Sequence, residues 1–338
     1  MSYTVTIQPS GKTITVNADE TILTAALRQH AVLAYNCRNG LCGTCKNKLL
    51  NGSVSYDQAE LKGLSDADRE QGLILCCQAK PNEDVVIEAE LIDAVSDIDI
   101  RTVPCRVASM KQLAHDVMQL QLKLPEGMGL IFLPGQYINF LLSNGEERSF
   151  SIASAAADNE MIELHIRHVP GGLFTDHVFN NMQEKDMLRF RGPLGTFFLR
   201  QELTGPIIFM AGGTGFAPIK SILQQMFSQP QQRDIFFYWG VRAQQDLYLH
   251  DLVTQRHQQF DRFHYIPVLS EPMDKDNWQG RCGWVHDAVI EDHPDLSDFS
   301  VYASGPPPMI LAAKPAFSAI GLQADHMFYD SFEFSHEV

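Results

Sequence analysis

The sequence has little basic charge and no long apolar run. Its 338 residues include 26 lysines and arginines against 41 aspartates and glutamates, which gives a formal net charge of -15. Because nucleic acids and anionic membranes are polyanions, this balance argues against either as a partner. The N-terminus lacks a basic stretch followed by an apolar core, and no later apolar run approaches the length of a membrane span. These absences predict a cytoplasmic protein, in which free thiols stay reduced.

Only 7 cysteines occur, but four of them have an informative spacing. Cys37, Cys42 and Cys45 form a C-x4-C-x2-C pattern, and Cys77 follows much later in the chain. This is the plant-type ligand spacing of a [2Fe-2S] cluster, in which four thiolates hold two irons. A zinc site or disulfides are the alternatives, but zinc more often uses paired C-x2-C motifs or cysteine with histidine. The spacing therefore predicts these four cysteines as cluster ligands, with Cys76 as a rival for the fourth position.

The first segment, residues 1–92, has the pattern of a small α+β domain. Alternating apolar and polar residues predict strands at residues 3–7, 13–16 and 85–87. Asp19 is a candidate N-cap for a helix whose apolar face starts at Ile22, and Asn51-Gly52 is a hairpin signal. With the cysteine loop after the helix, the segment resembles the β-grasp fold of plant-type ferredoxins.

The rest of the chain divides into two further predicted domains. In residues 101–200 short alternating strands are spaced by glycine and proline turns, which predicts an antiparallel β-barrel. In residues 205–338 continuous apolar runs alternate with helical patterns, as in a parallel sheet buried on both faces. This order predicts a doubly wound α/β domain. The polar and acidic stretch 93–99 is the expected hinge between the first segment and the second.

The second segment contains the motif Arg148-Ser149-Phe150-Ser151. This motif resembles part of the flavin site of the ferredoxin-NADP reductase superfamily. The resemblance implies that Arg148 binds the flavin diphosphate, Phe150 packs on the isoalloxazine and Ser151 bonds near its N5. Relatives usually have tyrosine where this chain has Phe150, so one hydroxyl contact is lost.

A second motif of the same site is Gly171-Gly172-Leu173-Phe174-Thr175. The resemblance implies that Gly171 and Gly172 let backbone N-H groups approach the flavin phosphates, and that Thr175 adds a hydroxyl. Relatives with an N-terminal iron-sulfur domain mostly hold FAD rather than FMN. The resemblance thus implies a barrel that binds FAD.

In the third segment two loops resemble the nicotinamide nucleotide site of that superfamily. They are Gly212-Gly213-Thr214-Gly215 and Ser304-Gly305-Pro306, each at the end of an expected strand, where open sheets bind ligands. The resemblance places Ser304 beside the nicotinamide, where relatives commonly have cysteine. Arg242 is followed by the acidic Asp246 and not by a basic cluster, which favours NADH over NADPH, although NADPH is possible. At the C-terminus Phe332 resembles an aromatic group that covers the flavin face, the alternative being a core residue.

The order of the three predicted domains resembles the iron-sulfur flavoprotein reductases that serve bacterial oxygenases and the CDP-6-deoxy-sugar dehydrase. Such a protein passes electrons from NADH through FAD and the [2Fe-2S] cluster to an electron-acceptor protein, either a dehydrase or an oxygenase component. A flavin is needed because nicotinamide donates two electrons together, whereas the cluster passes one at a time. The alternative is an NAD(P)H-flavin reductase that acts on free flavin.

Overall fold

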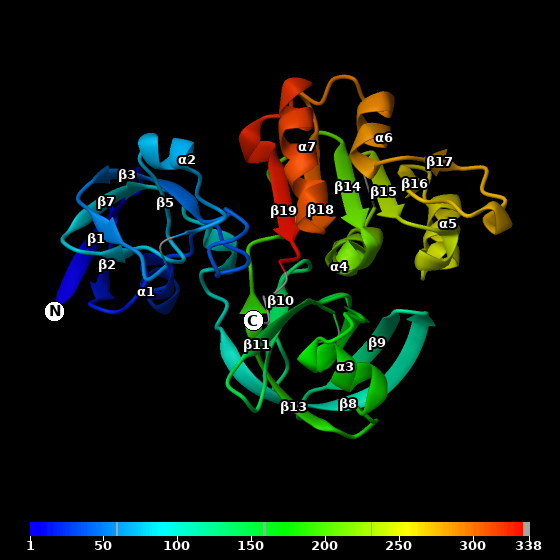
Figure 1. The fold of residues 1–338 in the computed structure, drawn as a ribbon, viewed down its shortest axis with the longest axis horizontal. Helices are drawn as coiled ribbons and strands as arrows, with labels where there is room; N and C mark the ends of the chain where they lie inside the picture. The colour runs from blue at the N-terminus through cyan, green and yellow to red at the C-terminus, as the bar shows by residue number, and fades with distance from the viewer. Residues whose placement is uncertain (59, 158–159, 231, 334–338) are drawn as a thin grey trace. The chain divides into compact units, whose positions relative to one another are not determined.

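The computed structural model describes residues 1–58, 60–157, 160–230 and 232–333. The chain forms two compact units, Met1–Asp99 and Ile100–Val338, and Figure 1 labels their helices and strands. Within the described stretches, no helix combines the length and the apolar character that crossing a membrane requires.

The first unit is built on a five-stranded sheet in the order β2-β1-β7-β3-β5. The strands of this unit are β1 (Ser2–Gln8), β2 (Lys12–Asn17), β3 (Lys46–Asn51), β4 (Val54–Ser55), β5 (Leu73–Leu75), β6 (Lys80–Pro81) and β7 (Val85–Glu88). Of these, β4 and β6 form a separate two-stranded sheet. The helices of this unit are α1 (Ile22–Arg28), α2 (Asp66–Glu70) and the 3-10 turn η1 (Asp93–Val95). β1 and β7 pair in parallel, and α1 buries Ile22 and Leu23. This mixed sheet with one main helix is the expected β-grasp fold.

Two local predictions in this unit are wrong. The N-cap of α1 is Thr21 and not Asp19, because the Thr21 hydroxyl accepts the N-H of Thr24 at 3.3 Å. Asn51-Gly52 does not close a hairpin, because β3 pairs with β5 and β7 whereas β4 pairs with β6. The chain bends at Gly52 and continues into a separate two-stranded sheet, β4-β6.

The second unit begins with a six-stranded antiparallel sheet in the order β11-β10-β13-β8-β9-β12. Its strands are β8 (Arg101–Ala114), β9 (Val117–Lys123), β10 (Tyr137–Leu141), β11 (Glu147–Ser151), β12 (Met161–Arg167) and β13 (Met187–Leu194), and α3 is Leu173–Asn180. A bridge between Ile152 and Leu164 links the two end strands, so the sheet closes on itself. Apolar side chains such as Phe140 and Phe190 fill the inside. The predicted barrel is confirmed.

The same unit continues into a parallel sheet in the order β17-β16-β15-β14-β18-β19. Its strands are β14 (Ile207–Gly212), β15 (Ile235–Val241), β16 (Phe263–Leu269), β17 (Arg281–Cys282), β18 (Ser300–Gly305) and β19 (Met327–Ser331). Its helices are α4 (Phe216–Phe227), α5 (His250–Gln259), α6 (Val285–Asp292) and α7 (Pro307–Ala319), with 3-10 turns η2 (Gly213–Gly215), η3 (Gln244–Asp246), η4 (Asp274–Asp276) and η5 (Ala324–His326).

Helices cover both faces of this parallel sheet (Figure 1). Along β14, Ile207 and Phe209 join a core with residues of α4, whereas Ile208 and Met210 join a core with α6 and α7. Because successive side chains of a strand point to opposite faces, both faces of β14 are apolar and buried. The strand order reverses between β14 and β18, and this switch point is where doubly wound sheets bind ligands.

Candidate functional site

The loop between α1 and β3 wraps closely around its cysteines. The backbone N-H groups of Asn39 and Cys42 both point at the sulfur of Cys37, each with a nitrogen-sulfur distance of 3.4 Å. Left-handed backbone occurs at Arg38, Gly40 and Gly43. A turn that aims N-H groups at sulfur stabilises thiolate ligands and is the kind of outer support that metal sites use.

The four expected ligands form two pairs. Cys37 interacts with Cys42, and Cys45 interacts with Cys77. Within each pair the interaction lowers the pKa of one thiol, Cys37 to about 7 and Cys77 below its usual value, and raises the pKa of Cys42 and Cys45. Among the described residues, no three cysteine sulfurs lie within 4.8 Å of one another. Two separate pairs fit a two-iron cluster, whereas a tetrahedral zinc ion with Zn-S bonds of about 2.3 Å would gather all four sulfurs around one point.

Cys76, the rival for the fourth position, has a different environment. It is fully buried, and the side-chain amide of Asn47 lies 3.4 Å from its sulfur. Burial raises the pKa of Cys76 to about 12. Cys77 instead makes the contact with Cys45. The arrangement therefore favours Cys77 as the partner of Cys45.

Strand β11, one of the two end strands of the barrel sheet, carries the first flavin motif. Arg148 donates to Glu146 at 2.7 Å, and the exposed Ser149 donates to strand β10 at 2.7 Å. The half-buried ring of Phe150 packs 5.3 Å from the ring of Phe174 in α3. Thus the aromatic side chain of β11 and the first turn of α3 meet, and the two flavin motifs lie together.

The glycine motif leads into the N-terminus of α3. Gly171 has a left-handed φ of 84°, and its N-H donates to Asp176 at 3.1 Å. The hydroxyl of Thr175 donates to the carbonyl of Val169 at 2.9 Å, which fastens the loop to itself. A Cβ on Gly172 would lie 2.6 Å from the Thr175 hydroxyl, so the turn requires glycine there. That this loop binds phosphate stays a prediction, which rests on the helix N-terminus.

The two predicted nucleotide loops touch at the switch point of the parallel sheet. Gly213 has a left-handed φ of 55°. A Cβ on Gly215 would collide with the carbonyl of Ser304, and a Cβ on Gly305 would lie 2.9 Å from the backbone of Gly212. The loops after β14 and β18 therefore pack backbone to backbone. This contact excludes side chains and leaves main-chain groups free to approach a dinucleotide.

Ser304 is the most unusual residue of this pair of loops. It is fully buried, and its Oγ has no hydrogen-bond partner among the described residues. The backbone N-H of Phe332 donates to the carbonyl of Gly305 at 2.9 Å, which places the C-terminal segment beside it. Pro306 is the N-cap residue of α7, and Thr214 is buried in the glycine loop. A buried hydroxyl without a partner suits a ligand that brings its own polar group.

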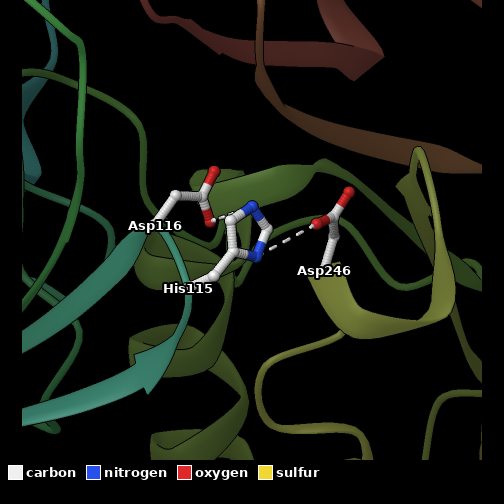
Figure 2. Close-up of side chains that lie close together, drawn as sticks. All are labelled: His115, Asp116 and Asp246. Atoms are coloured by element: carbon white, nitrogen blue, oxygen red, sulfur yellow. Dashed lines mark ion pairs between the residues drawn. The ribbon is translucent and has the colours of Figure 1, made fainter.

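Arg242 joins a cluster of charges between the barrel and the parallel sheet. Its side chain is 59% exposed, and its Nε lies 3.4 Å from Asp246. Figure 2 shows His115 between two carboxylates, with Nε2 3.9 Å from Asp116 and Nδ1 3.8 Å from Asp246. Arg167 donates to Asp116 at 2.9 Å. Each ring nitrogen faces a different acid and two guanidinium groups balance the two acids, so the cluster is an ion-pair network and not a metal cage.

Two buried polar residues at the site, Asp330 and Lys220, are not among the predicted site residues. Asp330 accepts a hydrogen bond from Ser151 at 3.0 Å, and Lys220 donates to Glu163 and to the carbonyl of Ala153, both at 3.0 Å. The only local signals are an acid beside the aromatic end of β19 and a lysine within an apolar stretch of α4. Neither signal identifies a partner, because each partner lies in another part of the chain.

Three family models match consecutive parts of the chain. The 2Fe-2S iron-sulfur cluster binding domain matches residues 5–82, the oxidoreductase FAD-binding domain matches residues 104–199, and the oxidoreductase NAD-binding domain matches residues 209–314. The matches contain the cysteine loop, both flavin motifs and both nucleotide loops. The expected cofactors, a [2Fe-2S] cluster, FAD and a nicotinamide nucleotide, are confirmed.

Curated relatives and a solved structure match almost the whole chain. The CDP-6-deoxy-L-threo-D-glycero-4-hexulose-3-dehydrase reductase of Yersinia pestis is 40% identical, over 98% of this chain and 99% of its own length. The reductase component of phenol 2-monooxygenase from Pseudomonas sp. is 36% identical, over 93% of this chain and 89% of its own. The crystal structure of the Amycolatopsis cytochrome P450 reductase GcoB is 30% identical with a TM-score of 0.80, over 98% of both chains.

The order of domains, the paired cysteines and these relatives agree. The chain belongs to the iron-sulfur flavoprotein reductases of the ferredoxin-NADP reductase superfamily and is an NAD(P)H-dependent oxidoreductase.

Proposed function

We propose that this chain oxidises NADH and delivers the electrons one at a time from its [2Fe-2S] cluster to a separate acceptor protein in the cytoplasm. The observation that carries the proposal is the presence of all three cofactor domains in one chain. FAD supplies the link when bound, because it accepts a hydride and releases single electrons. A plant-type cluster has a potential near about -400 mV, which suits a donor to another protein.

The proposed cluster ligands are Cys37, Cys42, Cys45 and Cys77. The pairing of Cys37 with Cys42 and of Cys45 with Cys77 supports this set. The loop's contribution is to keep backbone N-H groups near sulfur, which stabilises the charge of the thiolates. The reducing cytoplasm keeps these thiols available for iron.

The proposed flavin site lies where the two barrel motifs meet. Arg148 is proposed to exchange Glu146 for a bidentate contact with the diphosphate, because the diphosphate carries two negative charges whereas the carboxylate carries one. Phe150 offers an aromatic face, and Ser149 and Ser151 offer hydroxyls to the flavin. The residues proposed to surround the phosphates are Gly171, Gly172 and Thr175.

The proposed nicotinamide site lies at the switch point of the parallel sheet. The residues proposed to line it are Gly212, Gly213, Thr214, Gly215, Ser304, Gly305, Pro306 and Phe332. Close backbone packing at Gly215 and Gly305 supports the approach of a diphosphate, and the free hydroxyl of Ser304 supports a hydrogen bond to the nicotinamide.

NADH is the proposed donor because the charges near Arg242 oppose a 2'-phosphate. The Arg242 guanidinium lies 3.4 Å from Asp246 and 3.9 Å from Asp116. A ribose 2'-phosphate placed against Arg242 would therefore meet two carboxylates as well. The test is kcat/KM for both nucleotides, and a higher value with NADPH would overturn this assignment.

The proposed acceptor is a CDP-6-deoxy-hexulose dehydrase, with an oxygenase component as the second candidate. The first is supported by the 40% identity to the dehydrase reductase of Yersinia pestis, and the second by the 36% identity to the phenol monooxygenase reductase. Purified acceptors of both classes, added to the NADH-reduced enzyme, would distinguish them. The right acceptor oxidises the cluster within a turnover, and the wrong one leaves it reduced.

The relay itself is tested by anaerobic titration with NADH. Flavin bleaching and the EPR signal of the reduced cluster are followed together, and both are expected. A cluster that stays oxidised while the flavin bleaches would refute the relay. The Cys45→Ser variant separates the relay from a free-flavin reductase, since it should lose cytochrome c reduction but keep ferricyanide reduction by the flavin. If the reduction of added riboflavin is the main activity and the wild type and the Cys45→Ser variant catalyse it at the same rate, the free-flavin reductase is favoured.

A further inference from the structure

Lys220 is buried in a helix that begins at the predicted nucleotide loop. Its side chain is 7% exposed, and α4 starts directly after Gly215. Lysine is almost never buried unless its charge is paired, because the ammonium loses its hydration. The buried ammonium of Lys220 therefore requires a specific partner within the protein.

The partners of Lys220 lie in the barrel and not in its own domain. Its Nζ donates to the carbonyl of Ala153 and to the carboxylate of Glu163, at 3.0 Å each. The next residue, Ser221, donates from its hydroxyl to the carbonyl of Ser154 at 2.5 Å. Two consecutive residues of α4 thus donate hydrogen bonds to two consecutive carbonyls of the segment that follows β11.

That segment is the direct continuation of the flavin-motif strand. Ala153 lies two residues after Ser151, and its N-H donates to the carbonyl of Glu163 at 2.8 Å. The bridge between Ile152 and Leu164 fixes the preceding residue. The strand end is therefore held by β12 on one side and by α4 on the other.

A second buried route leads from Glu163 back to the nucleotide loop. His165 lies 2.7 Å from Glu163 through Nε2 and 3.0 Å from the hydroxyl of Tyr248 through Nδ1. The ring of Tyr248 packs edge-on against Trp239 at 5.1 Å. The indole N-H of Trp239 donates to the carbonyl of Gly213 at 2.9 Å. These polar and aromatic contacts therefore connect Glu163 of the barrel to Gly213 of the nucleotide loop.

We propose that Lys220 is a positioning residue for hydride transfer: together with Ser221 it fixes the end of the flavin-binding strand β11 relative to the nucleotide-binding loop Gly212–Gly215. Lys220 touches neither predicted cofactor motif, and it acts through the carbonyls that it holds. The proposal rests on the NADH-to-flavin step of the proposed function. Hydride transfer is sensitive to placement, since a shift of about 1 Å can slow an enzyme on the order of 100-fold.

The first test compares backbone hydrogen exchange and flavin reduction in the full-length holoenzyme and its Lys220→Met variant. Methionine keeps the chain length but removes the donor and the charge. Amides of residues 152–156 and 213–217 should exchange about 10-fold faster. Flavin reduction by NADH, measured per bound flavin in anaerobic stopped flow, should be about 10-fold slower, while the Kd for NAD⁺ changes less than about threefold.

The matched control is Gln224→Met, an exposed position one turn further along α4. It should leave exchange and flavin reduction unchanged. A deuterium isotope effect with NADH deuterated at the transferred position should be at least as large in Lys220→Met as in the wild type, because the slowed step is the hydride transfer.

A purely structural role for Lys220 predicts another result. The melting temperature and the flavin content would fall, but flavin reduction per bound flavin would stay within about twofold of the wild type. That result overturns the proposal, as does unchanged exchange in both segments. If Lys220→Met does not fold, Ser221→Ala decides: a reduction rate about threefold lower at unchanged NAD⁺ affinity supports the proposal, and an unchanged rate overturns it. If NADH does not reduce the flavin of the wild type, the proposed function is refuted instead. The exchange data would still test whether Lys220 holds the end of β11.

Discussion

The hydroxyl of Ser151 donates a hydrogen bond to Oδ2 of Asp330 at 3.0 Å, although 179 residues separate the two in the chain. Ser151 ends β11 of the barrel, and Asp330 lies in β19 of the parallel sheet. Both residues are buried, so water does not compete strongly for this bond. The orientation of a hydroxyl in the flavin motif is therefore set by a carboxylate of the nucleotide domain.

Replacing Asp330 by asparagine should slow flavin reduction while the flavin stays bound. The amide keeps the shape of the side chain but removes the charge, and a hydrogen bond to a charged group contributes roughly 1.5–3 kcal/mol. We expect flavin reduction by NADH to fall about 10-fold per bound flavin in anaerobic stopped flow. Asp325→Asn, an exposed position of the same segment, is the control and should behave as the wild type. Equal rates in the two variants would contradict a role for the Ser151–Asp330 bond.

The Ser304→Ala variant should gain stability and lose activity. The Ser304 hydroxyl is buried without a partner among the described residues, and such a group costs about 1–3 kcal/mol. Its removal should raise the free energy of unfolding of the ligand-free protein by about 1 kcal/mol, measured by denaturant titration. If the hydroxyl bonds to the nicotinamide, flavin reduction by NADH should slow about 10-fold. A loss of stability in the variant would mean that the hydroxyl has a partner in the free protein.

Short-range signals were enough to predict the fold. The alternation of residues in β9 and β12, the continuous apolar run of β14 and the spacing of Cys37 from Cys42 are each read within one stretch of sequence. The structure and the family matches confirm the β-grasp, barrel and doubly wound folds that follow from them. In such elements the local pattern and the final packing agree.

The contacts of the site could not be predicted in this way. The motif predicts Ser151 as a site residue, but no neighbouring residue in the chain predicts its partner Asp330. Lys220 likewise lies 57 residues from its partner Glu163. Such pairs form only after the barrel and the parallel sheet dock, so their signal is tertiary. The same limit explains Asn51-Gly52, where the turn is local but the choice of strand partner depends on the whole sheet.

Adjacent cysteines allow a direct test of the fourth cluster ligand. Cys77 pairs with Cys45, whereas Cys76 is fully buried beside Asn47. Cys77→Ser should lose most of its iron and labile sulfide and the EPR signal of the reduced cluster. Cys76→Ala should keep all three, although it should unfold more easily because a small cavity replaces the sulfur. The reverse pattern, with iron lost only from Cys76→Ala, would identify Cys76 as the ligand.

The pH dependence of stability should reveal the buried His165. Burial lowers the pKa of His165, so the neutral ring is the folded form, with Nε2-H donating to Glu163 and Nδ1 accepting from Tyr248. Burial raises the pKa of Glu163, but the hydrogen bond from His165 and the charge of Lys220 bring it to about 2, so Glu163 stays ionised near neutral pH. As the pH falls, the unfolded chain binds a proton near the usual histidine pKa of 6.5, before the folded protein does. The stability that His165 contributes is therefore complete above that pH and is lost below it.

The His165→Gln variant isolates this effect from the other histidines. Glutamine has an amide N-H that can replace Nε2-H toward Glu163, but it does not titrate. The free energy of unfolding, followed by flavin fluorescence in denaturant between about pH 7 and about pH 5, should fall less steeply in the variant, by up to about 1.4 kcal/mol per pH unit. His177→Gln, an exposed position in the last turn of α3, serves as a control and should keep the wild-type slope. A variant slope at His165 that equals the wild-type slope would mean that His165 titrates alike in the folded and unfolded chains, and the neutral, hydrogen-bonded ring would then be the wrong description.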